Sequence, residues 1–187
     1  MTWTALVPIR IGIAGKSRLE TVLDAAARET LVITMAHHVI DVLTHCPAIG
    51  SVAVVSNMPF SHPATTWAKD EGRGLNPEIS AFREGYGPAP LLVMHADLPL
   101  LEETDVEALL GVAEGHGIAL ATDRAGEGTN ALALADGRPF NFRFGPASRS
   151  LHCAQYAEMP VLQHSGLSAD LDTPDDLAFL RERGLQF

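Results

Sequence analysis

Short apolar runs alternate with longer segments of helical periodicity along most of this chain. We interpret the apolar runs at residues 5–7, 52–55, 91–95, 118–121 and 131–134 as strands, and we expect helices over residues 24–44, 76–85, 146–156 and 174–183. Another helix is expected to begin at Thr104, because Glu107 three residues later completes a capping box. Strands that alternate with helices form a mostly parallel sheet between helical layers. The sequence therefore predicts a three-layer α/β fold.

Size and composition favour one domain over residues 1–187. With 47% hydrophobic residues, a chain of 187 residues can bury a full core, and we interpret residues 58–74 as a loop that faces the active site rather than as a linker. No apolar stretch has membrane-spanning length and the first residues lack a signal peptide's basic region, so we expect a cytoplasmic protein without a membrane partner.

Charge and cysteine usage narrow the function classes further. The formal net charge of −10 argues against a protein that coats nucleic acid, because such proteins collect basic faces. Cys46 and Cys153 lie far apart in the sequence and form no C-x-x-C pair. We interpret them as reduced structural thiols rather than as zinc ligands or a disulfide.

Three carboxylates indicate a cation site. Asp97 follows the run at 91–95, which places it near the carboxyl end of a strand, where open α/β sheets bind ligands. Asp170 and Asp172 are one residue apart, so in an extended segment both point to the same side. If the three met, each pair of carboxylates about 5 Å apart would repel by roughly 3 kcal/mol at an effective dielectric of about 20. A divalent cation would reverse that penalty, and all-oxygen ligands suit Mg²⁺.

The alternative for any such aspartate is a helix cap or a turn. We assign that role to Asp175 and Asp176, which follow an expected N-cap at Thr173 and a proline, Pro174, at the first helical position. Asp170 and Asp172 precede this cap, and their spacing favours the ligand role.

Positive charge is concentrated in one glycine-containing loop. Lys16, one of only two lysines, lies beside Arg18 and follows Gly12 and Gly15. Two glycines three residues apart do not form the ordinary P-loop. They can still let the backbone approach an anion, with Lys16 as a point charge and Arg18 as a bidentate donor. An ordinary solvated loop is the alternative.

Two later loops are further anion-binding candidates. In G-E-G-T-N-A-L, paired glycines suggest a tight turn, and Thr129 and Asn130 can donate to a phosphate or orient it. In F-R-F-G-P-A-S, Gly145 and Ser148 precede an expected helix N-terminus, whose unpaired N–H groups favour anions. Ser148 could equally be a plain N-cap. Among the eight histidines, His95 lies nearest to the expected chemistry, but the adjacent Asp97 is the better ligand for a hard ion, and the role of His95 stays open.

The chain resembles the phosphoenolpyruvate or 2-phospho-L-lactate guanylyltransferases that serve deazaflavin coenzyme F-420 biosynthesis. Six segments that span almost the entire chain carry the resemblance: V-P-I-R…G-K-S-R-L, G-L-N, A-D-L-P-L-L, G-E-G-T-N-A-L, F-R-F-G-P-A-S and D-L-D-T-P-D-D-L. The A-D-L-P-L motif alone is typical of the wider Rossmann-like nucleotidyltransferases, whereas the combination is specific to the narrower group. The resemblance implies a three-layer Rossmann-like nucleotidyltransferase fold with a mostly parallel central sheet.

The resemblance also implies roles for individual residues. Those expected to hold Mg²⁺ are Asp97, Asp170 and Asp172. Those expected to meet the phosphate and carboxylate of the acid are Thr129, Gly145 and Ser148. Those expected to bind the nucleotide are Lys16 and Arg18, which would hold the GTP phosphates, and Asn76 of G-L-N.

The implied reaction transfers GMP from GTP to a small phosphorylated acid and releases pyrophosphate. The acid's phosphate oxygen attacks the α-phosphorus in line, so neither a covalent intermediate nor a dedicated base is expected. The sequence does not distinguish phosphoenolpyruvate, 2-phospho-L-lactate and 3-phospho-D-glycerate as the acid, or guanine from adenine. The product is expected to pass to a downstream transferase, and the oligomeric state, including a homodimer, stays open.

Two rival hypotheses remain at this point. One is another nucleotidyltransferase of the same fold that acts on a sugar phosphate or on molybdopterin. The other is a non-catalytic protein that senses GTP. Arg10, Pro77 and His95 depart from the more familiar family pattern, and these departures bear on substrate choice more than on reaction type.

Overall fold

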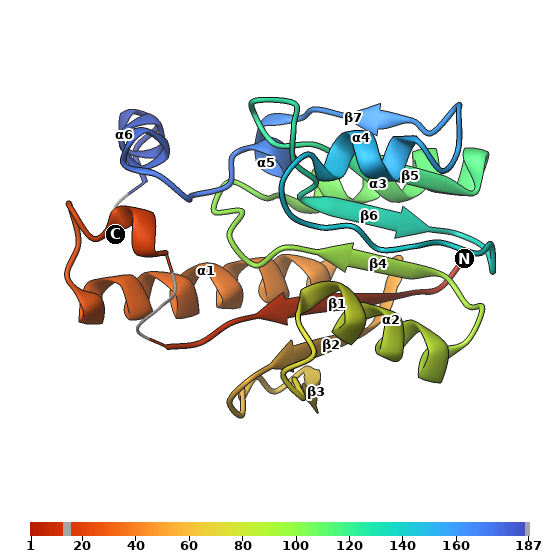
Figure 1. Ribbon diagram of the computed structural model, residues 1–187, viewed down its shortest axis with the longest axis horizontal. Coiled ribbons are helices and arrows are strands. Elements are labelled where there is room, and N and C mark those ends of the chain that lie inside the picture. Colours follow the sequence, from red (N-terminus) through yellow and green to blue (C-terminus); the bar gives the residue numbers. More distant parts are fainter. Residues whose placement is uncertain (13–15, 186–187) are drawn as a thin grey trace.

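A seven-stranded sheet with helices on both faces organises the chain (Figure 1). The computed structural model describes residues 1–12 and 16–185. The strands are β1 (Trp3–Ile9), β2 (Ile49–Ser56), β3 (Thr65–Lys69), β4 (Leu91–Met94), β5 (Ile118–Ala121), β6 (Ala131–Leu134) and β7 (Val161–Leu162). They lie in the order β3-β2-β1-β4-β6-β5-β7, and all pairs are parallel except those that β6 makes with β4 and β5. The predicted mostly parallel α/β fold is confirmed.

The helices form layers on the two faces of this sheet. They are a 3-10 helix η1 (Ser17–Leu19), α1 (Ala25–His45), α2 (Leu75–Tyr86), α3 (Glu103–His116), α4 (Ser148–Cys153), α5 (Ser165–Ser168) and α6 (Pro174–Glu182). Because successive strand residues point to opposite faces, Val7 packs in one cluster with α1 and α3, while Leu6 packs in another with Ile79 of α2 and Phe144. Within the described residues, no helix has the length and apolarity needed to cross a bilayer.

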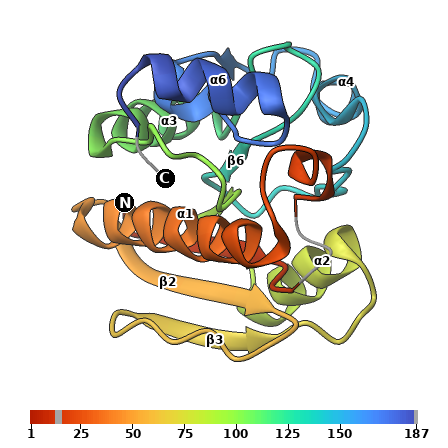
Figure 2. The ribbon, with the colours of Figure 1, turned by 90° about the vertical axis from the view of Figure 1, so that its left-hand side faces the viewer.

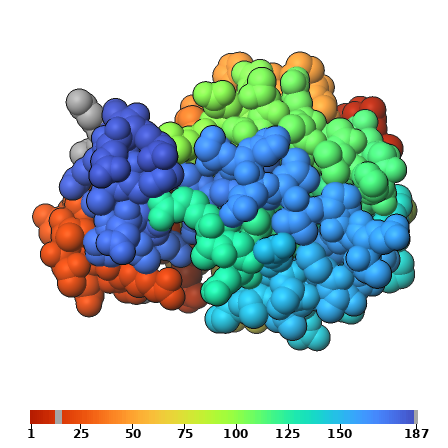
Figure 3. All heavy atoms as spheres, turned by 90° about the horizontal axis from the view of Figure 1, so that it is seen from above, coloured from red at the N-terminus to blue at the C-terminus, as the bar shows by residue number. Residues whose placement is uncertain are grey.

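A third apolar cluster fixes the C-terminal helix beside the start of the chain. Leu177 and Leu180 of α6 pack with Leu171, with Leu19 of η1 and with Leu31 of α1. Figures 2 and 3 show α6 lying over the N-terminal part of α1. This packing holds the D-L-D-T-P segment close to the loop that carries Lys16.

The predicted N-cap of α6 is confirmed, whereas the predicted capping box of α3 is wrong. Thr173 caps α6, and its hydroxyl accepts from the Asp176 N–H at 3.3 Å. At α3 the cap is Glu102, whose N–H donates to the Asp105 carboxylate at 3.1 Å, so the predicted box of Thr104 and Glu107 is two residues too late. Glu102 is still extended, whereas Thr104 already lies inside the first helical turn.

Several elements differ from the sequence prediction because few apolar residues mark them. Residues 58–74 contain β3, an edge strand with a partly exposed Trp67, and the remainder from residue 70 reaches the pocket described below. The helix expected over 146–156 spans only Ser148–Cys153, and its N-cap is Ala147 rather than Ser148. The short β7 and α5 were not predicted.

Candidate active site

The acidic residues meet beyond the carboxyl end of β4. The carbonyl of Asp97 accepts a 3.1 Å hydrogen bond from the Leu171 N–H, which fixes the neighbouring D-L-D-T-P segment beside it. Leu171 is buried in the α6 cluster, whereas Asp170 and Asp172 on either side are only partly buried. This alternation agrees with the extended geometry predicted for the two aspartates.

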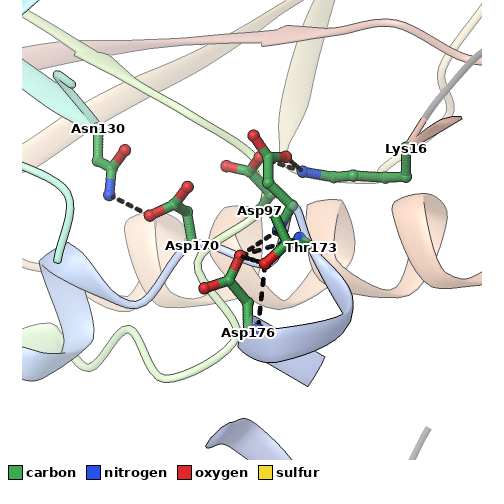
Figure 4. A network of polar contacts seen from close by, with 7 residues as sticks. Lys16, Asp97, Asn130, Asp170, Thr173 and Asp176 are labelled. Atoms are coloured by element: carbon green, nitrogen blue, oxygen red, sulfur yellow. Dashed lines mark hydrogen bonds and ion pairs between the residues drawn. The ribbon is translucent and has the colours of Figure 1, made fainter. Parts of the chain in front are cut away.

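Lys16 joins two of the three carboxylates. Its ammonium group donates to Oδ2 of Asp97 and to Oδ1 of Asp172 (Figure 4). Burial works against the charged form of Lys16, but Asp97 and Asp172 outweigh it and raise the lysine pKa. Burial likewise works against an ionised Asp97, but the charge of Lys16 lowers the pKa of this carboxyl. Both groups are therefore charged near neutral pH.

Asn130 positions the third carboxylate. Its Nδ2 donates to Oδ1 of Asp170 at 3.2 Å and to the carbonyl of Leu167 at 3.0 Å. Burial, and then the charge of Asp97, raises the pKa of Asp170 to about 6. The negative charge here is thus only partly compensated, and a bound cation would favour ionised Asp170. Asn130 acts on Asp170 here, in addition to the phosphate-orienting role that the sequence suggested.

The donor set fits a magnesium ion. Oδ1 of Asp97 is buried and has no hydrogen-bond partner within the part of the chain that the structure describes. The Lys16 ammonium shows that a cation is accommodated between Asp97 and Asp172. No group of three or more His, Cys, Asp or Glu side chains forms a metal centre within residues 1–12 and 16–185. Mg²⁺ commonly takes only one or two carboxylates and fills its octahedron with water and substrate phosphate.

A cavity of about 530 Å³ opens beside these carboxylates. Lys16, Arg18, Asp97 and Asp172 line it, together with Arg10 at the end of β1. The connection from β3 to α2 and the first turn of α2 supply another part of its wall through the residues Asp70, Gly72, Gly74, Leu75 and Glu78. A cavity of this size accommodates a small ligand. It brings the predicted phosphate-binding residues together with two of the predicted metal ligands.

An ion pair that was not predicted from the sequence holds the wall of the cavity near α2. Glu78 is buried and accepts from Arg73 through the backbone N–H at 3.0 Å and through Nη2 at 2.6 Å. The Arg73 guanidinium lowers the pKa of Glu78 to about 2. The pair closes the segment between β3 and α2 into a fixed turn.

Asn76 joins α2 to the F-R-F-G loop. Its Oδ1 accepts from the Phe144 N–H at 2.7 Å and its Nδ2 donates to the Phe144 carbonyl at 3.0 Å. The neighbouring Leu75 lines the pocket, but the amide of Asn76 is engaged by this loop. Direct contact with the nucleotide stays a prediction, whereas positioning of the loop is what the contacts support.

Asn76→Ala is expected to lower the free energy of unfolding by about 1–3 kcal/mol, because two backbone groups of Phe144 lose their partner. For the reaction that the sequence predicts, the KM for the acid should rise more than the KM for GTP. Urea unfolding and steady-state kinetics measure both. Asn57→Ala is the matched control, because Asn57 makes the same pair of bonds with Ile11, at 2.9 and 2.8 Å, in an exposed position. Equal stability losses in the two variants would contradict this account.

His152 draws the predicted acid-binding residues together. Its Nε2 accepts from the Arg143 N–H at 2.9 Å, so the imidazole proton lies on Nδ1, which is 3.0 Å from the Thr129 hydroxyl. Nδ1–H therefore donates to Thr129, whose own O–H remains available to an anion. Ser148 lies one helical turn before His152, and Gly145 accepts from the Ser148 N–H at 3.1 Å. His152 was not predicted, and no local motif marks it, because its partners Thr129 and Arg143 lie in different loops.

The lowered pKa of His152 should make the free energy of unfolding depend on pH. Burial lowers its pKa from 6.5 to about 4, so between these values the unfolded chain binds more protons than the folded one. Stability should therefore rise with pH across that window, by up to about 1.4 kcal/mol per pH unit. Urea unfolding from pH 4 to 6.5 should show a shallower slope for His152→Phe than for the wild type. Identical slopes would refute the assignment of a buried neutral imidazole.

Comparison with known proteins assigns the family. Residues 3–184 match the family described as guanylyl transferase CofC like. The chain belongs to the CofC-like guanylyl transferase family. The phosphoenolpyruvate guanylyltransferase of Sphaerobacter thermophilus is 35% identical, with 95% of this chain and 91% of that protein aligned. The same-named protein of Rubrobacter xylanophilus is 36% identical over 98% and 96%.

Solved structures support the fold of this CofC-like chain. A nucleotidyl transferase from Methanothermobacter has a TM-score of 0.66 at 12% identity, with 97% of each chain covered. The 4-diphosphocytidyl-2C-methyl-D-erythritol synthase of Anaerococcus prevotii has a TM-score of 0.59 at 11% identity, with 99% of this chain and 96% of that chain covered. The predicted Rossmann-like nucleotidyltransferase fold is therefore confirmed.

Proposed function

We propose that this CofC-like chain transfers GMP from GTP to the phosphate of a small phosphorylated carboxylic acid, with release of pyrophosphate, in coenzyme F-420 biosynthesis. The observation that carries the proposal is the meeting of Lys16, Asp97 and Asp172 at the edge of a nucleotide-sized cavity. The names of the two relatives, phosphoenolpyruvate guanylyltransferases, support guanylyl transfer to such an acid.

Two groups of residues flank the reacting atoms in this proposal. On the nucleotide side, Lys16 and Arg18 bind the GTP phosphates and stabilise the departing pyrophosphate. On the acid side, the Thr129 hydroxyl and the loop from Gly145 to Ser148 bind the phosphate and the carboxylate. Asp170 is tied to the acid side, because Asn130, which follows Thr129, donates to its carboxylate. Asp97 is tied to the nucleotide side through Lys16.

Asp97, Asp170 and Asp172 would hold Mg²⁺, which when bound neutralises phosphate charge and polarises phosphoryl oxygens. The chain's own contribution is to hold two mutually repelling anions in line, which converts an encounter in solution into a reaction within one complex. The attacking phosphate is already anionic, so no side chain needs to remove a proton. Lys16, charged by virtue of its two carboxylate partners, supplies fixed positive charge.

An acceptor screen tests the proposal. The protein is incubated with Mg²⁺ and GTP, and pyrophosphate release is followed with phosphoenolpyruvate, 2-phospho-L-lactate or 3-phospho-D-glycerate, with a downstream transferase present to trap an unstable product. We expect release with one of these acids and none without an acid. Release only with a sugar phosphate or molybdopterin would favour the rival nucleotidyltransferase. GTP binding without any release would favour a sensor.

A further inference from the structure

His95 lies between the cavity proposed to bind the nucleotide and the loop proposed to bind the acid, and it has no role in the reaction proposed above. It directly follows β4, and its N–H donates to the Asn130 carbonyl at 2.9 Å, which fixes its backbone to the start of β6. Its ring packs against Phe144 with 5.2 Å between the ring centroids. The same residue lines the cavity that Lys16 and Asp97 line. The ring is thus held between the nucleotide pocket and the loop expected to bind the acid.

One ring nitrogen of His95 makes no hydrogen bond within the described chain. Nε2 of His95 is buried and has no hydrogen-bond partner among the described residues. A buried polar atom without a partner is uncommon in native proteins and calls for an explanation such as an absent ligand. An apolar side chain of similar size would pack against Phe144 without leaving a buried nitrogen unpaired. The packing alone therefore does not account for a histidine here.

Charges around the ring identify the kind of ligand. His95 lines the same cavity as Asp97, Lys16 and Asp172, so it lies beside the cluster where the phosphates are proposed to react. An N–H group there can donate to a phosphoryl oxygen, whereas a carboxylate can only repel one. Because its backbone hydrogen bond and Phe144 fix the ring in advance, donation requires little reorganisation during the reaction.

We propose that Nε2–H of His95 donates a hydrogen bond to a non-bridging oxygen of the α-phosphoryl group during transfer; this rests on the proposed function. In that step the bond between the acid's phosphate oxygen and the α-phosphorus forms, and the bond from the α-phosphorus to the β-phosphate oxygen breaks. Pyrophosphate leaves with the electron pair. His95 neither gains nor loses a proton, and it stabilises the charge on the transferring group.

Three variants test this role. His95→Leu keeps an apolar group against Phe144 and removes the donor, whereas His95→Gln places an amide N–H₂ near the position of Nε2. His116→Leu is the matched control, because His116 lies at the exposed end of α3. Thermal unfolding monitors the fold, and calorimetry with α,β-methylene GTP measures nucleotide binding. We expect kcat to fall by about 10²-fold in His95→Leu, with both KM values unchanged. His95→Gln should recover most of the rate, and His116→Leu should match the wild type.

Two kinetic results for His95→Leu would overturn the proposed role of His95. Wild-type kcat in His95→Leu would overturn the inference, and so would a rise in the KM for the acid at unchanged kcat, which would place the ring on the acid instead. If His95→Leu does not fold, the rate of His95→Gln relative to His95→Met decides, and equal rates would overturn the inference. A wild-type protein that releases no pyrophosphate with any acid refutes the proposed function itself, and the inference with it.

Discussion

Asp97→Asn is expected to reduce kcat/KM by at least about 10³-fold, which corresponds to roughly 4 kcal/mol of lost transition-state stabilisation. Asp97 shares the Lys16 ammonium with Asp172, accepts from the Leu171 N–H through its carbonyl, and keeps a buried carboxylate oxygen that has no partner among the described residues. The amide retains the shape of the side chain but removes the charge that would hold Mg²⁺ and keep Lys16 in place. The backbone bond that Asp97 accepts is unaffected, so the fold should persist.

Pyrophosphate release over a range of Mg²⁺ concentrations measures this effect, and thermal unfolding monitors the fold. Asp175→Asn is the matched control, because Asp175 is exposed in the first turn of α6. That change should cost at most about 1 kcal/mol of stability through the helix dipole and leave turnover intact. Near-normal turnover of Asp97→Asn at saturating Mg²⁺ would exclude Asp97 as a metal ligand.

Lys16→Met is expected to lower turnover by about 10²- to 10³-fold, a loss comparable to removal of one transition-state donor from other active sites. The KM for GTP should rise as well, because Lys16 lines the cavity that is proposed to bind the nucleotide. Methionine resembles the unbranched apolar stem of lysine but carries no charge, so Asp97 and Asp172 would lose their shared counter-ion.

The chain's other lysine provides the control for this change. Lys69 is mostly exposed and pairs with Glu71 at 3.1 Å, and surface pairs of this kind contribute about 0–1 kcal/mol. Lys69→Met should therefore leave kcat and KM unchanged. Equal activity of the two variants would contradict the assignment of Lys16 to the GTP phosphates.

Features encoded in a few neighbouring residues could be predicted from the sequence. The cap at Thr173, the strand that ends before Asp97 and the one-residue spacing of Asp170 and Asp172 all follow from local chemistry. The cap of α3 shows the limit of this reasoning, because two boxes with the same spacing overlap there. The structure selects Glu102, directly after the buried Leu101, as the cap.

Contacts between distant parts of the chain could not be predicted in this way. Lys16 meets Asp97 and Asp172, which lie 81 and 156 residues further along. The pairing of β1 with β4 brings the loop of Lys16 close to Asp97, and the packing of α6 on η1 brings it close to Asp172. His152 was missed for the same reason, since its partners Thr129 and Arg143 come from different loops. The edge strand β3 was missed because its exposed Trp67 breaks the expected pattern of buried apolar residues.

The most direct test of the central claim is to follow the phosphorus atoms of GTP. The protein is incubated with Mg²⁺, the acid that supports turnover, and GTP labelled at either the α- or the γ-phosphorus. The account predicts that the α label enters the adduct with the acid and that the γ label leaves as pyrophosphate. Appearance of the γ label on the acid, or as orthophosphate, would contradict it.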